Sequence, residues 1–167
     1  MSLSMYQASA PVFDKMLGNL AVILAKAAAW AETRKIEPPT LLTARLAPDM
    51  FTLTRQVQIA ADAAKGACAR LAGVEPPKFD DVETSFAELQ ARIAKTRQFV
   101  ATFKPAQLDG SEDRPIKFKG GTREFDFTGQ SFLLGFALPN LFFHVTTAYD
   151  ILRHNGLELS KGDYLGL

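Results

Sequence analysis

Apolar residues recur every three or four positions in four separate segments of this chain. The narrowest pattern lies in residues 50–71, where the apolar positions are Met50, Leu53, Val57, Ala60, Ala64, Cys68 and Leu71. The other segments are residues 13–30, 82–103 and 129–155. This spacing places the apolar side chains on one face of an α-helix. Because each helix must bury that face, the pattern predicts that four helices pack together as a four-helix bundle.

Proline and capping residues indicate where these helices begin and bend. Pro48-Asp49 is expected to open the second helix, because a proline suits the first helical turn and an acid suits its positive end. Asp80 or Asp81 offers a cap for the third helix, on which Arg92 is expected to face solvent. Pro139 lies inside the fourth helix and should kink it or divide it into two pieces.

The period of the pattern changes between the third and fourth helices. Ile116, Phe118, Phe125 and Phe127 alternate with charged residues around Gly120-Gly121. Alternation with a period of two about a Gly-Gly turn predicts a β-hairpin with one apolar face. An isolated hairpin is only marginally stable in water, so we expect this face to cover one end of the bundle.

The connections between the predicted helices are long. About 15 residues separate the first two helices and about 25 separate the last two, which is more than a simple up-and-down bundle needs. Long connections allow two neighbouring helices to run parallel. The expected fold is therefore mainly α: a single domain, residues 1–167, that forms a four-helix bundle with crossover connections and a small β-hairpin between helices three and four.

The charge balance and the cysteine count exclude several classes of function. The 19 basic and 18 acidic residues leave a formal net charge of +1, without the basic excess of a nucleic-acid-binding protein. The single cysteine, Cys68, cannot form an internal disulfide. Residues 20–25 are too short an apolar run for a signal peptide, and residues 131–149 fit a buried helix better than a membrane span. We therefore expect a cytoplasmic protein with no nucleic-acid partner and no membrane partner.

One face of the fourth helix carries the polar residues that best suit a functional site. Asn140, His144, Thr147 and Ile151 are spaced by four, three and four residues, so they share this face, with His144 at the edge of the apolar stripe. A partly buried imidazole at neutral pH can act as a base, an acid or a metal ligand. It can also be a core histidine that makes only a hydrogen bond to a neighbouring helix, which is the commoner case.

A metal site needs more ligands than these helices offer. Zinc or nickel in a bundle usually takes three protein ligands, and this chain has two histidines. His154 follows His144 by ten residues, which is roughly 15 Å along a helix. A site would therefore need His144 together with carboxylates such as Asp62 or Asp49 from the second helix. The sequence predicts no metal site and no cofactor.

Phenylalanine is unevenly distributed along the chain. Seven of the thirteen lie in one quarter of the sequence, at Phe118, Phe125, Phe127, Phe132, Phe136, Phe142 and Phe143. With the neighbouring leucines they cover more of the fourth helix than one seam of a bundle can bury. Either the hairpin or a second subunit must cover the remaining face, and we predict a homodimer that forms through the fourth helix.

Three stretches of the sequence resemble a known family. They are MYQASAPVFDKMLGNL at residues 5–20, RLAPDMFTLTRQVQIAADAAKGACARLAG at residues 45–73 and LPNLFFHVTTAYDILRHNGLELSKGDYLG at residues 138–166. With the hairpin, they resemble an uncharacterised bacterial domain-of-unknown-function family that is similar to the DinB/YfiT-like superfamily. The resemblance implies a four-helix bundle with crossover connections.

The resemblance also implies where a functional site would lie. Many members of the superfamily hold a metal ion with three histidines, one on helix two and an H-x-x-x-H pair on helix four, and some are thiol-dependent S-transferases or isomerases. His144 matches the second histidine of the pair, whereas Asn140 replaces the first and Gln56 or Val57 occupies the position on helix two. Amides bind zinc or nickel poorly beside imidazole, so this departure argues against metal-dependent chemistry.

The remaining polar residues define a candidate pocket. They are His144, Asn140, Gln56, Asp62, Tyr149 and Arg153. We expect them to line a small-molecule site between helices two and four, or to form a structural hydrogen-bond network. One alternative function is a thiol-dependent transferase or hydrolase in which His144 is the base or the sole metal ligand. Another is a dimeric interaction protein without catalysis. The sequence leaves open whether the protein is an enzyme.

Overall fold

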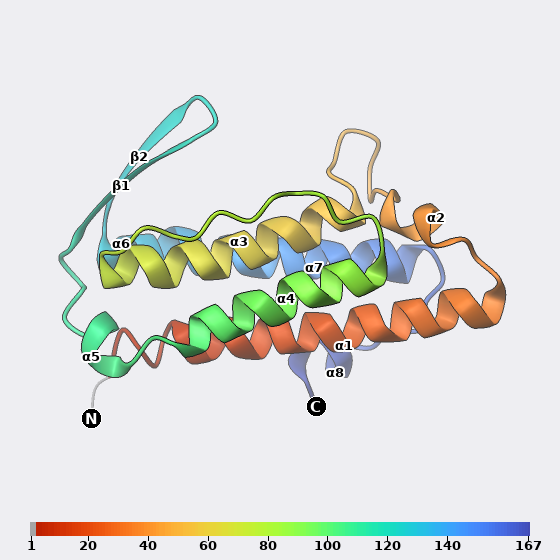
Figure 1. Ribbon diagram of the computed structural model, residues 1–167, viewed down its shortest axis with the longest axis horizontal. Coiled ribbons are helices and arrows are strands. Elements are labelled where there is room, and N and C mark those ends of the chain that lie inside the picture. Colours follow the sequence, from red (N-terminus) through yellow and green to blue (C-terminus); the bar gives the residue numbers. More distant parts are fainter. Residues whose placement is uncertain (1–2) are drawn as a thin grey trace.

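The computed structural model describes residues 3–167 and shows a mainly helical protein with one small hairpin, as expected (Figure 1). The long helices are α1 (Ala10–Arg34), α3 (Leu53–Ala72), α4 (Phe86–Ala101) and α7 (Leu138–His154). α3 packs against α4 and α7, and α1 packs against the same two helices. Apolar side chains from all four helices are buried between them and form the core.

Short helices add to the four that the apolar pattern predicts. They are α2 (Pro38–Leu42), α5 (Pro105–Leu108), α6 (Gly129–Phe132) and α8 (Lys161–Leu165). The predicted count of four is therefore incomplete. A helix of four or five residues makes little more than one turn, so no apolar stripe can reveal it.

The second predicted helix, α3, begins later than its proline indicates. Thr52 is the N-cap, and its side-chain oxygen accepts a hydrogen bond from the backbone N–H of Arg55. This bond satisfies one of the free donors of the first helical turn. Pro48-Asp49 lies in the turn before the helix. α3 ends at Ala72, and Gly73 follows it with a φ of 73°, the left-handed conformation that glycine adopts readily.

The third predicted helix, α4, is capped by Ser85 and not by Asp80 or Asp81. The Ser85 side chain accepts a hydrogen bond from the backbone N–H of Glu88, and the Glu88 carboxylate accepts one from the backbone N–H of Thr84. This reciprocal pair satisfies free N–H groups at the helix start. The two aspartates lie in the loop before it.

The loop between α3 and α4 allows these two neighbouring helices to run parallel. Figure 1 shows this loop running back along α3 to the start of α4. It comprises residues 74–85. An extended chain advances about 3.3 Å per residue against about 1.5 Å for a helix, so this short loop spans a helix of 20 residues. This loop is therefore the crossover connection. The two longer connections, from which we predicted a crossover, do not provide it.

The fourth predicted helix is divided before Pro139. α6 continues into a π-helical turn, η1 (Leu133–Ala137), and α7 then begins with Pro139 in its first turn. A proline has no N–H to donate to the carbonyl one turn earlier, so it fits a helix start and a widened turn precedes it. The buried face of α7, which includes His144, packs against α3.

The hairpin packs on the start of this fourth helical stretch. Its strands are β1 (Pro115–Gly120) and β2 (Arg123–Thr128), paired antiparallel. The turn is Gly121-Thr122, one residue later than predicted. The Phe118 ring lies 5.8 Å from the ring of Phe132 and 5.5 Å from that of Phe136, between centroids. The aromatic face thus rests on α6 and η1 at one end of the helices, while the tip projects away from them (Figure 1).

One helical stretch, Gly129–His154, is long and apolar enough to cross a membrane by length and composition alone. Its mean hydropathy is 1.3, and 44% of the tested window is buried inside the protein. Core helices of soluble proteins pass the same test, so this stretch is weak evidence for a membrane span.

Candidate functional site

His144 on α7 and Gln56 on α3 face each other where these two helices pack together. Both side chains are buried: 8% of His144 and 1% of Gln56 is exposed. His144 Nδ1 lies 2.6 Å from Gln56 Oε1, which is a short hydrogen bond. The two residues meet because each lies on the buried face of its own helix.

The hydrogen bonds of Gln56 determine which imidazole nitrogen carries the proton. Gln56 Nε2 donates to the carbonyl oxygen of Phe51 at 3.3 Å, so the amide oxygen faces His144. An amide oxygen only accepts, and therefore Nδ1 carries the proton and Nε2 keeps a lone pair. Within residues 3–167, the fully buried side-chain atoms without a partner are Arg92 Nε and Ser111 Oγ. His144 Nε2 is not one of them and makes no hydrogen bond among these residues, so this nitrogen is not fully buried.

The surroundings keep the imidazole neutral. Burial lowers the pKa of His144 from 6.5 to about 4, and the positive charge of Arg55 acts in the same direction. Removing a charged group from water disfavours its charged form. A neutral imidazole with a free Nε2 accepts hydrogen bonds well, but with a pKa of about 4 it holds a transferred proton weakly.

One exposed aromatic side chain lies against this pair, and a second exposed phenylalanine contacts it through its backbone. The Phe143 ring is 56% exposed and meets the His144 ring edge to face, with centroids 5.3 Å apart. Phe51, whose carbonyl orients Gln56, is 55% exposed. The exposed Phe143 side chain beside the polar pair offers a surface that favours the apolar part of a ligand or partner.

The structure brings only part of the predicted pocket together. Asn140 lies one turn before His144 on α7 and is partly buried. Tyr149 and Arg153 hold the segment that follows α7, because the Tyr149 hydroxyl donates to the carbonyl of Leu159 at 3.2 Å and Arg153 donates to that of Leu157 at 3.3 Å. The pair of His144 and Gln56, with Asn140 beside it, remains as the candidate site.

The sixth predicted residue, Asp62, belongs to a separate ion cluster around Arg92. Arg92 was expected to face solvent, but only 2% of its side chain is exposed. Its guanidinium lies 3.0 Å from Asp62 Oδ1, 2.9 Å from Asp81 Oδ1 and 2.9 Å from Glu83 Oε1. Burial alone would lower the pKa of Arg92, but these carboxylates outweigh it and the pKa is raised. The Arg92 cluster therefore fastens the α3–α4 loop to both helices.

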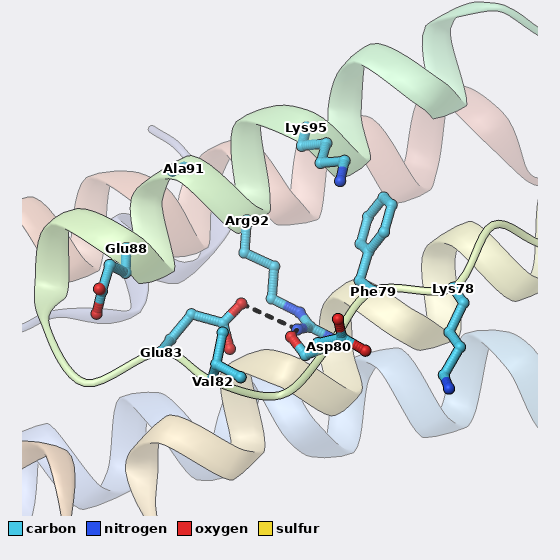
Figure 2. Close-up of a pocket in the computed structure, with 9 residues that line it drawn as sticks. All are labelled: Lys78, Phe79, Asp80, Val82, Glu83, Glu88, Ala91, Arg92 and Lys95. Atoms are coloured by element: carbon cyan, nitrogen blue, oxygen red, sulfur yellow. Dashed lines mark hydrogen bonds and ion pairs between the residues drawn. The ribbon is translucent and has the colours of Figure 1, made fainter.

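A hollow of about 380 Å³ lies between α4 and this loop. Figure 2 shows Arg92 reaching from α4 toward Glu83 and Asp80, with Phe79 directed toward Lys95. Two ammonium groups, those of Lys65 and Lys95, each lie 4.1 Å from the centroid of the Phe79 ring. Cations are attracted to an aromatic face, so these contacts also hold the loop. Among the charged side chains that line this hollow, Arg92 and Glu83 form an ion pair with each other.

The residues near His144 do not fit the three-histidine metal centre of the superfamily. In the part of the chain that the structure describes, no three His, Cys, Asp or Glu side chains lie close enough to share an ion. Gln56 and Asn140 supply amides, and Gln56 Oε1 already accepts a hydrogen bond from Nδ1. One imidazole beside amides is a poor donor set for zinc or nickel. That no metal binds in solution stays a prediction.

Comparison with known proteins assigns the family. A family model described as Domain of unknown function (DUF1993) matches residues 5–165. The chain belongs to the DUF1993 family. A crystal structure of a DinB family member protein from Shewanella denitrificans is similar to this DUF1993 protein, with a TM-score of 0.87 and 45% sequence identity over 97% of this chain and 92% of that one. No curated protein matches the sequence significantly.

These comparisons confirm the resemblance read from the sequence, an uncharacterised family with a DinB-like fold. They do not assign a role to any residue of this DUF1993 protein. Gln56 could be placed opposite His144 only through the resemblance, because the two residues are 88 positions apart. One feature of the sequence could have indicated that Arg92 is paired. It is the group of acidic residues that precedes α4, namely Asp80, Asp81 and Glu83.

Proposed function

We propose that this DUF1993 protein binds a small molecule on the surface beside His144, Gln56 and Phe143. In this proposal His144 Nε2 accepts a hydrogen bond from the ligand. The observation that carries it is the 2.6 Å contact between Nδ1 and Gln56 Oε1, which leaves Nε2 as a free acceptor. A ring nitrogen that makes no hydrogen bond inside the protein can accept one from a ligand.

The chemistry of the ligand follows from the groups around it. An accepting nitrogen requires a donor, such as a hydroxyl, an amine or a thiol. The exposed ring of Phe143, which lies against the His144 ring, favours an apolar body attached to that donor. His144 as a whole is buried, so we infer a shallow site in which the donor reaches inward and the apolar body rests on Phe143.

Catalysis by proton transfer is the weaker alternative. A thiol-dependent transferase or hydrolase would need His144 to take a proton from a group whose ordinary pKa is about 8.5. The pKa of His144 is about 4, so this transfer is strongly uphill. Cys68 offers no replacement nucleophile, because its thiol is buried and burial raises its pKa to about 12. These observations favour binding over acid–base chemistry.

A matched pair of probes tests the proposal. Benzyl alcohol has an apolar ring and one donor, whereas benzyl methyl ether has the same ring and no donor. In chemical-shift titrations the wild-type protein should bind the alcohol about fivefold more tightly, since a net hydrogen bond contributes about 1 kcal/mol. The shifts should centre on α7 around His144 and on the start of α3.

Two variants make this experiment specific. His144→Phe should abolish the preference for the alcohol and retain binding of the ether. His154→Phe changes the other histidine, which is exposed, and should keep the wild-type preference. Equal affinity for the two compounds, or no shifts near His144 with either, would count against the site.

A second candidate function is self-association through the fourth helical stretch. Leu134 and Phe143 are 53% and 56% exposed, on a stretch with a mean hydropathy of 1.3. A second copy packed against this stretch would remove exposed apolar side chains from water. Sedimentation velocity at micromolar concentration should show a dimer that Leu134→Lys weakens and that Val82→Lys, on the exposed loop, does not. A compact wild-type monomer would exclude this candidate.

A further inference from the structure

Arg70, in the last turn of α3, is a partly buried cation without a visible counter-charge. The salt bridges among the described residues involve other cations, so no carboxylate there lies within 4.0 Å of its guanidinium. Burial lowers the pKa of Arg70, and the more distant charge of Glu75 offsets this only in part. A cation that is partly removed from water without a partner is unfavourable unless something else compensates it.

Two contacts hold the Arg70 guanidinium in one place. Its central carbon lies 4.6 Å from the centroid of the Phe118 ring. The side chain also folds back over Gly66, where a Cβ would lie 2.4 Å from Arg70 Nη1. The guanidinium therefore points one turn toward the start of α3 and away from the carbonyls at the helix end, which are the usual partners of a basic residue in a last turn.

The Arg70 side chain lines a hollow of about 300 Å³ between α3 and the Pro76-Pro77 segment. Lys78 also lines it and makes no ion pair within residues 3–167. Figure 2 shows the Lys78 side chain pointing away from Phe79. The carboxylate in the lining, Asp62, is already bound by Lys65 at 2.8 Å and by Arg92. The hollow thus presents two unpaired cations.

We propose that this hollow binds the oxyanion group of a small metabolite, a phosphate or a carboxylate, with Arg70 as its main ligand and Lys78 as a second positive charge. The planar fork of a guanidinium matches two oxygens of such a group. The two prolines provide an apolar wall for the carbon part of the ligand. A volume of about 300 Å³ suits a small molecule. The site is separate from His144 and does not depend on the function proposed there.

Titration with inorganic phosphate and with acetate, at constant ionic strength, tests this site in the full-length protein. We expect saturable chemical-shift changes at residues 65–78, and Arg70→Gln should weaken binding at least about tenfold, because hydrogen bonds to charged groups are strong. Tighter binding of phosphate identifies a phosphoryl ligand, and tighter binding of acetate identifies a carboxylate. Either result supports the oxyanion site.

Gly66→Ala is the sharper variant because it removes no charge. The added Cβ must displace the Arg70 guanidinium, which is the flexible end of a side chain, so the backbone need not move. Alanine is also the better helix former, so folding should be preserved. Anion affinity should nevertheless fall about fivefold or more, since the guanidinium loses its position.

Arg34→Gln controls for the loss of one positive charge, because Arg34 is an exposed arginine in the last turn of α1. It should bind phosphate and acetate as the wild type does. The proposal is overturned by a wild type that shows no saturable response to either anion. It is equally overturned if Gly66→Ala binds as the wild type, or if Arg34→Gln weakens binding as much as Arg70→Gln.

Discussion

Protonation of His144 should make this protein sensitive to acid well above the range in which carboxylates titrate. Its ordinary pKa of 6.5 falls to about 4 in the folded state, through burial and the charge of Arg55. Between these two values the unfolded chain binds a proton that the folded protein does not, so the free energy of unfolding falls as the pH falls. The fall of the His144 pKa from 6.5 to about 4 corresponds to roughly 3 kcal/mol of stability in total.

Urea denaturation at pH 7, 6, 5 and 4.5 measures this loss. The wild-type free energy of unfolding should fall by roughly 2 kcal/mol across this range through His144 alone. The lowered pKa of Glu83 means that its stabilising contribution is lost mainly below pH 4.5. His144→Gln should therefore be nearly flat in the same range, while His154→Gln should keep the wild-type slope.

An NMR titration of the imidazole resonances gives an independent reading. A His144 pKa close to 6.5, or a His144→Gln variant with the wild-type pH dependence, would refute the argument that burial keeps this ring neutral.

Three further predictions concern the Arg92 cluster, the His144–Gln56 hydrogen bond and the close approach of Gly129 to Ser111. Arg92→Met should lower the free energy of unfolding by about 2–4 kcal/mol, measured in urea at pH 7. This loss is smaller than for a wholly buried ion pair, because Asp62 and Asp81 are about 40% exposed. Arg92→Lys should lower the free energy of unfolding by less than Arg92→Met. Gln56→Glu places a carboxylate beside Nδ1 of His144 and should raise the pKa of His144 above 4. NMR measures this pKa, and an unchanged value would contradict the hydrogen bond between the two side chains. Gly129→Ala puts a Cβ 1.9 Å from the carbonyl oxygen of Ser111 and should lower the free energy of unfolding by about 2–3 kcal/mol. Circular dichroism should show this as a lower Tm. A wild-type Tm would show that this close approach does not exist.

The candidate site was only partly predictable from the sequence. The spacing of Asn140 and His144 put both on one face of the fourth helix, because helical periodicity is a local property. The same reasoning could not separate Asp62, Tyr149 and Arg153 from this pair. Which residues join a site depends on how neighbouring helices are rotated and on where loops pack, and neither follows from one helix considered alone.

The sequence by itself determined the long helices, the hairpin and the inward face that carries His144, because apolar spacing, prolines and glycines act on the chain within a few residues. Only the tertiary structure decided that α3 and α4 run parallel, that Arg92 is buried among carboxylates, and that Arg70 lies against Gly66 and Phe118. These outcomes depend on pairings such as Arg92 with Asp62, 30 positions apart. Such residues meet only when the chain between them folds back and closes a loop. Patterns within a few residues of sequence do not predict which distant residues will meet.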